Sequence, residues 1–70
     1  MVKITTTGHT NRGAAWQTVR YELANGDVLT NNAVVWNLNG KWIAENDAVA
    51  IVKSIDRNAA ENIYETDHQG

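Results

Sequence analysis

Apolar and polar residues alternate through residues 18–23. This period of two predicts a β-strand with one covered face, because successive side chains of a strand point to opposite faces. The apolar side chains there are Val19, Tyr21 and Leu23, and the polar ones are Thr18, Arg20 and Glu22. Asn25-Gly26 follows, and both residue types accept the positive φ angles of a type I′ hairpin turn. A two-residue loop would place Leu23 opposite Val28 in the returning strand.

A second hairpin is predicted around Asn39-Gly40, which has the same turn chemistry. The β-branched and aromatic residues before this turn can pair with the apolar residues after it. With a two-residue loop, Trp36 faces Ile43 on one side of the hairpin and Val35 lies on the other.

The residues before this second turn also fit a short helix. Thr30 can cap a helix over residues 31–38, and Gly40 lies near its C-terminal end, where glycine is common. Because both patterns fit, the sequence leaves the choice between strand and helix open.

The C-terminal third changes to a spacing of three or four residues between apolar positions. This spacing predicts one apolar stripe along a helix of about 18 residues. Asn46 is a suitable N-cap, and Asp47 beside it suits the positive end of the helix dipole. A strand over residues 49–55 is the alternative, since apolar residues also alternate there. The stripe consists of Ala48, Ile51, Val52, Ile55, Ala59 and Ile63.

Together these elements predict an α+β fold, in which a small antiparallel sheet of three or four strands packs against one C-terminal amphipathic helix. Two Asn-Gly hairpins supply most of the sheet, and Val2, Ile4 and Thr6 predict a further short strand before a loop over residues 8–13. Residues 1–65 are expected to form one compact domain, because no linker divides the chain. Residues 66–70 offer no apolar side chain to dock and are expected to fray.

The composition is typical of a folded domain, with 43% hydrophobic and 20% charged residues among 70. The chain has no cysteine, which excludes disulfides and thiolate metal sites. Its first residues lack the apolar run of a signal peptide, and no segment approaches the ~20 apolar residues of a membrane span. These features predict a cytoplasmic protein with no membrane partner.

The charges argue against direct nucleic-acid binding. Six Lys and Arg residues stand against eight Asp and Glu residues, giving a net charge of −2. The six cations are dispersed along the chain, whereas a surface that follows phosphates needs them clustered. A weak nucleic-acid binder is therefore only the third of the functions considered.

No set of residues predicts catalysis, and no cofactor or metal site is predicted. His9 and His68 lie near opposite ends of the chain and are expected to be solvated; a pair of histidine and carboxylate would form only if those ends meet in space. Ser54 is the one serine and lies on the solvent side of the predicted helix, and the threonines follow no nucleophile motif. The sequence therefore predicts a protein that is not an enzyme.

The tryptophans are the unusual part of the composition, since the chain has three Trp and no Phe. Trp36 and Trp42 fit the core as its large side chains. Trp16 lies on the polar side of the predicted strand, and tryptophan is frequent at the centre of protein interfaces. We therefore expect Trp16 to be an exposed anchor. The predicted partner-binding residues are Trp16, Arg20, Glu22 and Arg12.

The function predicted first is a small protein-binding module that docks on a larger protein or complex through this polar strand face or an uncovered sheet edge. So small a core also favours a homodimer, which would add buried surface. Small size, mild acidity and the lack of a catalytic set are typical of phage or mobile-element accessory proteins that inhibit host complexes, including anti-CRISPR-like inhibitors. The alternative is a glycan-binding or small-ligand module, which would need two exposed, coplanar tryptophans on one sheet face.

Overall fold

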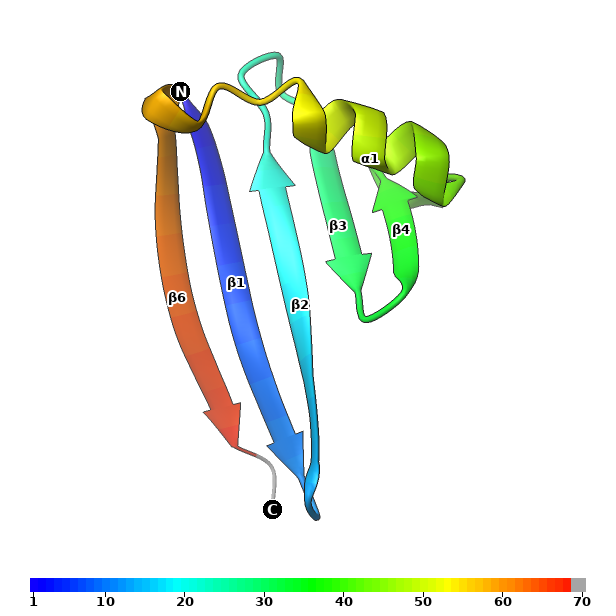
Figure 1. Cartoon of the computed structure of the whole chain (residues 1–70), viewed down its shortest axis with the longest axis vertical. Helices are drawn as coiled ribbons and strands as arrows, with labels where there is room; N and C mark the ends of the chain where they lie inside the picture. The colour runs from blue at the N-terminus through cyan, green and yellow to red at the C-terminus, as the bar shows by residue number, and fades with distance from the viewer. Residues whose placement is uncertain (69–70) are drawn as a thin grey trace.

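One mixed sheet of six strands, with a helix across one end, makes up the computed structural model, which describes residues 1–68 (Figure 1). The strand order is β5-β4-β3-β2-β1-β6, antiparallel throughout except that β6 runs parallel to β1. The predicted α+β class is confirmed, but the prediction of three or four antiparallel strands is wrong. The elements are β1 (Val2–Asn11), β2 (Ala14–Glu22), β3 (Val28–Asn32), β4 (Val35–Leu38), β5 (Lys41–Trp42), α1 (Glu45–Lys53), the 3-10 turn η1 (Arg57–Ala59) and β6 (Ala60–His68).

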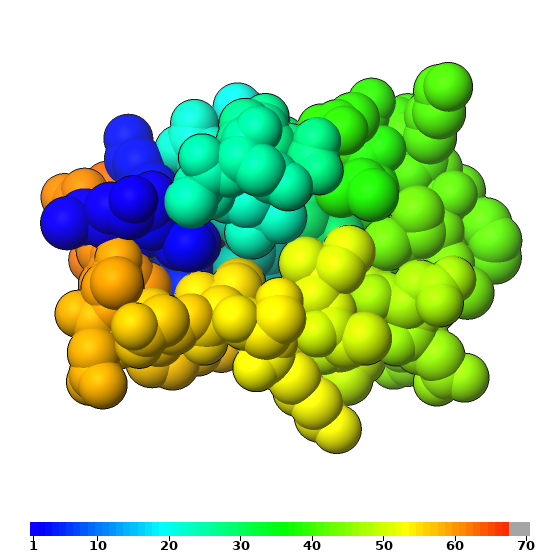
Figure 2. Space-filling view, turned by 90° about the horizontal axis from the view of Figure 1, so that it is seen from above, coloured from blue at the N-terminus to red at the C-terminus, as the bar shows by residue number. Residues whose placement is uncertain are grey.

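The helix α1 lies over only one end of the sheet. It crosses β3 and β4, while β1, β2 and β6 extend well beyond it (Figure 1). Seen from above, the strands form one layer, and α1 with the chain that follows it forms the other (Figure 2). One face of the sheet is therefore covered in part, and no element of residues 1–68 covers the other face. None of the helices described here is long and apolar enough to cross a membrane.

The core lies between α1 and the covered end of the sheet. Leu29 of β3 and Ala48 of α1 are fully buried, and they pack with three other buried apolar side chains. Ala48 of the predicted apolar stripe is buried within α1, as predicted, whereas Ile55 of that stripe is buried but lies after the end of α1. The five buried residues are Ile4, Tyr21, Leu29, Ala48 and Ile55.

The predicted long helix is wrong in its second half. The helix α1 ends at Lys53, and Ile63 of the predicted stripe lies in β6 next to Thr5 of β1. The chain turns because Ile55 is buried in the core and the Asp56 carboxylate accepts a hydrogen bond from the Asn58 backbone N–H at 3.0 Å. The apolar spacing that extends to Ile63 therefore arises from two separate elements, α1 and β6.

Both ends of the predicted helical segment also differ from expectation. The N-cap is Ala44, which has no side chain to accept a hydrogen bond, and Asn46 lies inside the first turn. Residues 66–68, where a frayed tail was expected, belong to β6. Residues 69 and 70 of that tail lie outside the described residues.

Of the two Asn-Gly turns, the second is confirmed. Asn39 and Gly40 have φ angles of 52° and 83°, as a type I′ turn requires, and the Ile43 N–H donates to the Trp36 carbonyl oxygen at 3.1 Å. The predicted register across this hairpin, with Trp36 opposite Ile43, is therefore correct.

The first Asn-Gly turn is longer by one residue than predicted. The Leu23 N–H donates to the Asp27 carbonyl oxygen at 2.9 Å, so Val28 lies opposite Glu22 rather than Leu23. Gly26 has a positive φ but Asn25 does not; instead the Asn25 side-chain oxygen accepts from the Asp27 N–H at 2.9 Å. Asn25 thus stabilises the turn through its side chain and not through a positive φ. The Asn-Gly dipeptide alone does not distinguish these two roles of asparagine.

Two further turns were not predicted. Residues 31–38 contain the ends of β3 and β4 joined through Ala33 and Val34, so the helix alternative is wrong. The predicted loop over residues 8–13 is mostly strand, and only Arg12 and Gly13, both with positive φ, form the turn between β1 and β2. The tight turn at Arg12-Gly13 allows the long β1 and β2 to pair along nearly their whole length.

Candidate functional site

The uncovered face of the sheet, which we call the open face, carries every second residue of each strand. The registers fix its members, because directly paired residues of neighbouring strands point to the same side. They are Lys3, Thr5, Thr7, His9 and Asn11 of β1; Ala14, Trp16, Thr18, Arg20 and Glu22 of β2; Val28, Thr30 and Asn32 of β3; Val35 and Asn37 of β4; Trp42 of β5; and Glu61, Ile63, Glu65 and Asp67 of β6.

Three of the four predicted partner-binding residues lie on the open face. Arg20 is exposed, and its Nη2 lies 3.7 Å from Oε1 of Glu22, whose Oε2 lies 3.9 Å from Nζ of Lys3. Arg12 is exposed in the turn at the opposite end of β2 from Glu22, so the structure does not bring it to the other charges. Exposed ion pairs of this kind contribute about 0–1 kcal/mol to stability, so these side chains remain available to a partner.

Trp42, predicted to be in the core, is exposed. Its exposed fraction is 72%, because it pairs with Asn37 and therefore lies on the open face. Trp36 lies on the other face, where it is half-buried and stacks on Tyr21 with a centroid separation of 6.3 Å. Trp36 and Trp42 belong to the two paired strands of one hairpin, and the register places their side chains on opposite faces of the sheet.

Trp16, predicted to be an exposed anchor, is half-buried. Its ring stacks on the imidazole of His9, with centroids 5.2 Å apart and planes inclined by 16°. The prediction that Trp16 shares a face with Thr18 and Arg20 is nevertheless confirmed by the strand register. Of the two tryptophans on this face, Trp42 is the more accessible.

His9, expected to be solvated, is the centre of a hydrogen-bonded cluster. Its Nδ1 lies 3.3 Å from Oδ2 of Asp67, and its Nε2 lies 2.9 Å from Oγ1 of Thr18. The His9 side chain is only 16% exposed. A neutral imidazole has one N–H and one free nitrogen, so Nδ1 can donate to Asp67 while Nε2 accepts from the Thr18 hydroxyl.

This cluster was missed at the level of sequence because its members come from three strands. His9 and Asp67 are 58 residues apart, and the parallel pairing of β1 with β6 places them side by side. Strands from the two ends of the chain therefore meet, and His9 and Asp67 form the histidine–carboxylate pair that depended on this meeting. His68, the other histidine, belongs to β6 and pairs in register with Thr10.

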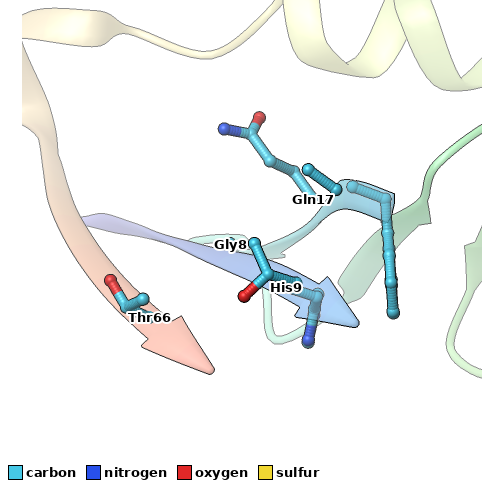
Figure 3. A pocket seen from close by; sticks show the side chains of 7 residues that line it. Gly8, His9, Gln17 and Thr66 are labelled. Carbon is cyan, nitrogen blue, oxygen red and sulfur yellow. The ribbon is translucent and has the colours of Figure 1, made fainter. Parts of the chain in front are cut away.

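A shallow hollow lies near these residues. It has a volume of about 290 Å³, and most of its lining lies on the face of the sheet that α1 covers elsewhere. It exists because Gly8 has no side chain between Gln17 and Thr66, which border it from β2 and β6 (Figure 3). No carboxylate or ammonium group lines this hollow, and within residues 1–68 no group of three or more metal-ligating side chains is found.

Comparison with known proteins adds no functional assignment: no family model, curated protein or solved structure matches the chain.

Proposed function

We propose that this chain is a protein-binding module that docks a partner protein on its open face. The observation that carries this proposal is the position of Trp42, an exposed tryptophan on the same uncovered face as Trp16, Arg20 and Glu22. Tryptophan and arginine are enriched at protein interfaces and among the residues that contribute most to their affinity.

The strand register aligns Trp42 and Arg20 in one row across the whole sheet, while Trp16 and Glu22 lie in other rows of the same face. Neighbouring strands are about 4.8 Å apart, so a row that crosses six strands spans roughly 24 Å. That length is comparable with one side of a standard protein interface. The row offers an aromatic ring, small polar groups, a guanidinium and an apolar end. In order it comprises Trp42, Asn37, Thr30, Arg20, Thr5 and Ile63.

The charges of the open face indicate the chemistry of the partner. Glu61, Glu65 and Asp67 project from β6 at one border of this face. A partner that presents Lys or Arg side chains there would gain electrostatic complementarity, which mainly increases specificity and association rate. We therefore propose a partner surface that is basic where it meets β6 and apolar where it meets Trp42.

A second copy of the chain fits this surface less well. The cations on the open face within residues 1–68 are Lys3 and Arg20, and both already lie near Glu22. The acidic side chains of β6 also disfavour a nucleic acid, because its phosphates would meet carboxylates. A cytoplasmic location and an inhibitory effect on a larger host complex stay predictions.

A matched pair of variants tests the proposal. Trp42 and Tyr64 are similarly exposed, at 72% and 79%, but Tyr64 lies on the opposite face of the sheet. A central interface tryptophan contributes about 2 kcal/mol or more, so Trp42→Ser should weaken partner binding about 30-fold, whereas Tyr64→Ser should leave it unchanged. Affinity is measured by titration against the partner isolated on the wild-type chain.

Equal loss in both variants, or loss only in Tyr64→Ser, would contradict a role for the open face. Two alternative classes are tested with the same proteins. A shift of tryptophan fluorescence on titration with oligosaccharides would support the glycan-binding alternative. Binding to single-stranded or duplex DNA that disappears between low and moderate salt would support the nucleic-acid alternative.

A further inference from the structure

A hydroxyl, an imidazole and a carboxylate are hydrogen-bonded in sequence on the open face. Thr18 Oγ1 lies 2.9 Å from Nε2 of His9, and Nδ1 of the same ring lies 3.3 Å from Asp67. A nucleophile hydrogen-bonded to a base that is itself oriented by a third group is the arrangement used in covalent acyl transfer. We propose that Thr18 is a nucleophile that accepts an acyl group from small activated esters, with His9 as its general base.

Backbone pairing positions the three members of the cluster. They lie on β1, β2 and β6, and β1 pairs with both of the other strands along nearly its whole length. The ring of His9 is fixed further by the stacked ring of Trp16. Asp67 is a positioning residue, because it holds the proton on Nδ1 and leaves Nε2 free to accept the hydroxyl proton of Thr18.

A donor for the developing oxyanion lies on the next strand. Asn32 is the direct cross-strand partner of Thr18 on β3, and its exposed side chain lies on the same open face. Directly opposed residues have Cβ atoms about 4.5–5.5 Å apart, so the Asn32 amide can reach an oxygen on a carbon bonded to Thr18 Oγ1. A side-chain amide in this role can contribute a factor of about 100–1,000 to the rate.

The open surface limits the substrate class. Without a deep cavity, the site can orient only a short acyl chain, and it needs a leaving group that departs readily. The ring of Trp16 next to His9 offers apolar contact to an aromatic leaving group. Acetyl esters of phenols meet both conditions.

The reaction balances without any further co-reactant except water. The Thr18 oxygen attacks the ester carbonyl carbon while its proton moves to Nε2 of His9. When the tetrahedral intermediate collapses, the bond to the phenol oxygen breaks and the phenol takes that proton. Water then attacks the acyl-Thr18 ester with His9 again accepting the proton, and the proton returns to Thr18 as the carboxylic acid leaves.

Trypsin cleavage makes the test unambiguous. Cleavage after Arg12 and Arg20 releases residues 13–20, in which Thr18 is the one side chain with a hydroxyl group and no lysine occurs. When the reaction with p-nitrophenyl acetate is quenched with acid during the burst, before the acyl-Thr18 ester is hydrolysed, we expect this peptide to carry one acetyl group by mass spectrometry. Acetyl groups found only on other peptides, or no acetylation at all, would overturn the proposal.

Kinetic controls separate this chemistry from the background reactivity of surface amines. Thr18→Val removes the oxygen that is acylated, so it should abolish the burst of p-nitrophenolate, whereas Thr18→Ser keeps a hydroxyl group and should retain the burst. Thr6→Val, on the opposite face of β1 from His9, should behave as the wild type. A burst that survives Thr18→Val, or that Thr6→Val removes equally, would contradict the role of Thr18. If far-UV circular dichroism shows that Thr18→Val does not fold, the mass of the wild-type peptide tests the proposal by itself.

The positioning role of Asp67 has its own spectroscopic signature. The ¹⁵N shifts of the His9 ring should report the tautomer with the proton on Nδ1, and Asp67→Asn should move the proton toward Nε2 and slow acetylation of Thr18. An unchanged tautomer with unchanged acetylation in Asp67→Asn would exclude this role. Because the probe is an ester and not a protein, failure of this test leaves the proposed binding function untouched.

Discussion

At the scale of single residues, backbone conformation and strand parity decide which side chains reach the surface. Trp36 and Trp42 lie in the same hairpin, but a type I′ turn at Asn39-Gly40 places one in the core and the other on the open face. The turn that joins β3 to β4 contains Ala33, which has a φ of 54°. That conformation costs a non-glycine residue about 1–2 kcal/mol because its Cβ crowds the backbone.

Ala33→Gly should therefore stabilise the protein. Relief of the strain exceeds the added entropy of the unfolded chain, so we expect the free energy of unfolding to rise by about 0.5–1 kcal/mol. Urea denaturation followed by tryptophan fluorescence measures the change. The matched control is Ala15→Gly in the extended strand β2, where glycine should destabilise by about 0.5–1 kcal/mol. A loss of stability in Ala33→Gly would contradict the strained turn.

At the scale of elements, α1 is short and begins without a side-chain cap. Ala44 occupies the N-cap in the extended conformation that a capping residue adopts, with φ of −67° and ψ of 147°. Asp47 and Glu45 are already in the first turn, so a new cap would add to a favourable electrostatic arrangement. The helix depends mainly on Ala48 and its neighbours in the core.

Ala44→Ser should stabilise this helix, because the hydroxyl can accept a free backbone N–H of the first turn. We expect a gain of about 0.5–1 kcal/mol in the free energy of unfolding. Ala50→Ser, on the exposed side of α1, should instead cost up to about 0.5 kcal/mol through lower helix propensity. If both substitutions destabilise equally, the assignment of Ala44 as the N-cap is wrong.

The elements that sequence patterns predicted are those whose signals are local. The turn at Asn39-Gly40 and the alternation through residues 18–23 each depend on residues close in the chain. The strand β6 was missed because its stability comes from pairing with β1, far away in sequence. The apolar residues before it continued the helical spacing of α1, and the turn begun by Asp56 gave no strong signal.

At the scale of the whole molecule, one long sheet is only partly covered. The principal extents are 37 × 25 × 17 Å, and the buried core lies at the end beneath α1. The far halves of β1, β2 and β6 have backbone pairing but little apolar burial. The open face was predictable only in part. The alternation of residues along β2 predicted that Trp16, Arg20 and Glu22 share one face, but the cluster at His9 depends on the position of β6 beside β1.

Hydrogen exchange should follow this uneven burial. Amides of residues 3–6 in β1 lie beside the buried Ile4, whereas residues 7–10 are paired on both sides without a covering layer. Local opening should therefore be easier in the second group, and its amides should exchange about tenfold faster or more. Mass spectrometry or NMR can measure this. Uniform protection along β1 would show that the far half of the sheet is covered in solution.

Both proposals depend on β6 lying beside β1, since this pairing forms the acidic border of the open face and brings Asp67 to His9. The most direct test is a nuclear Overhauser measurement on the isotope-labelled chain. The account predicts backbone contacts along the parallel ladder, including Lys3 with Glu61 and Thr5 with Ile63. Helical contacts between residues three apart through 57–63, with no contacts to β1, would contradict it.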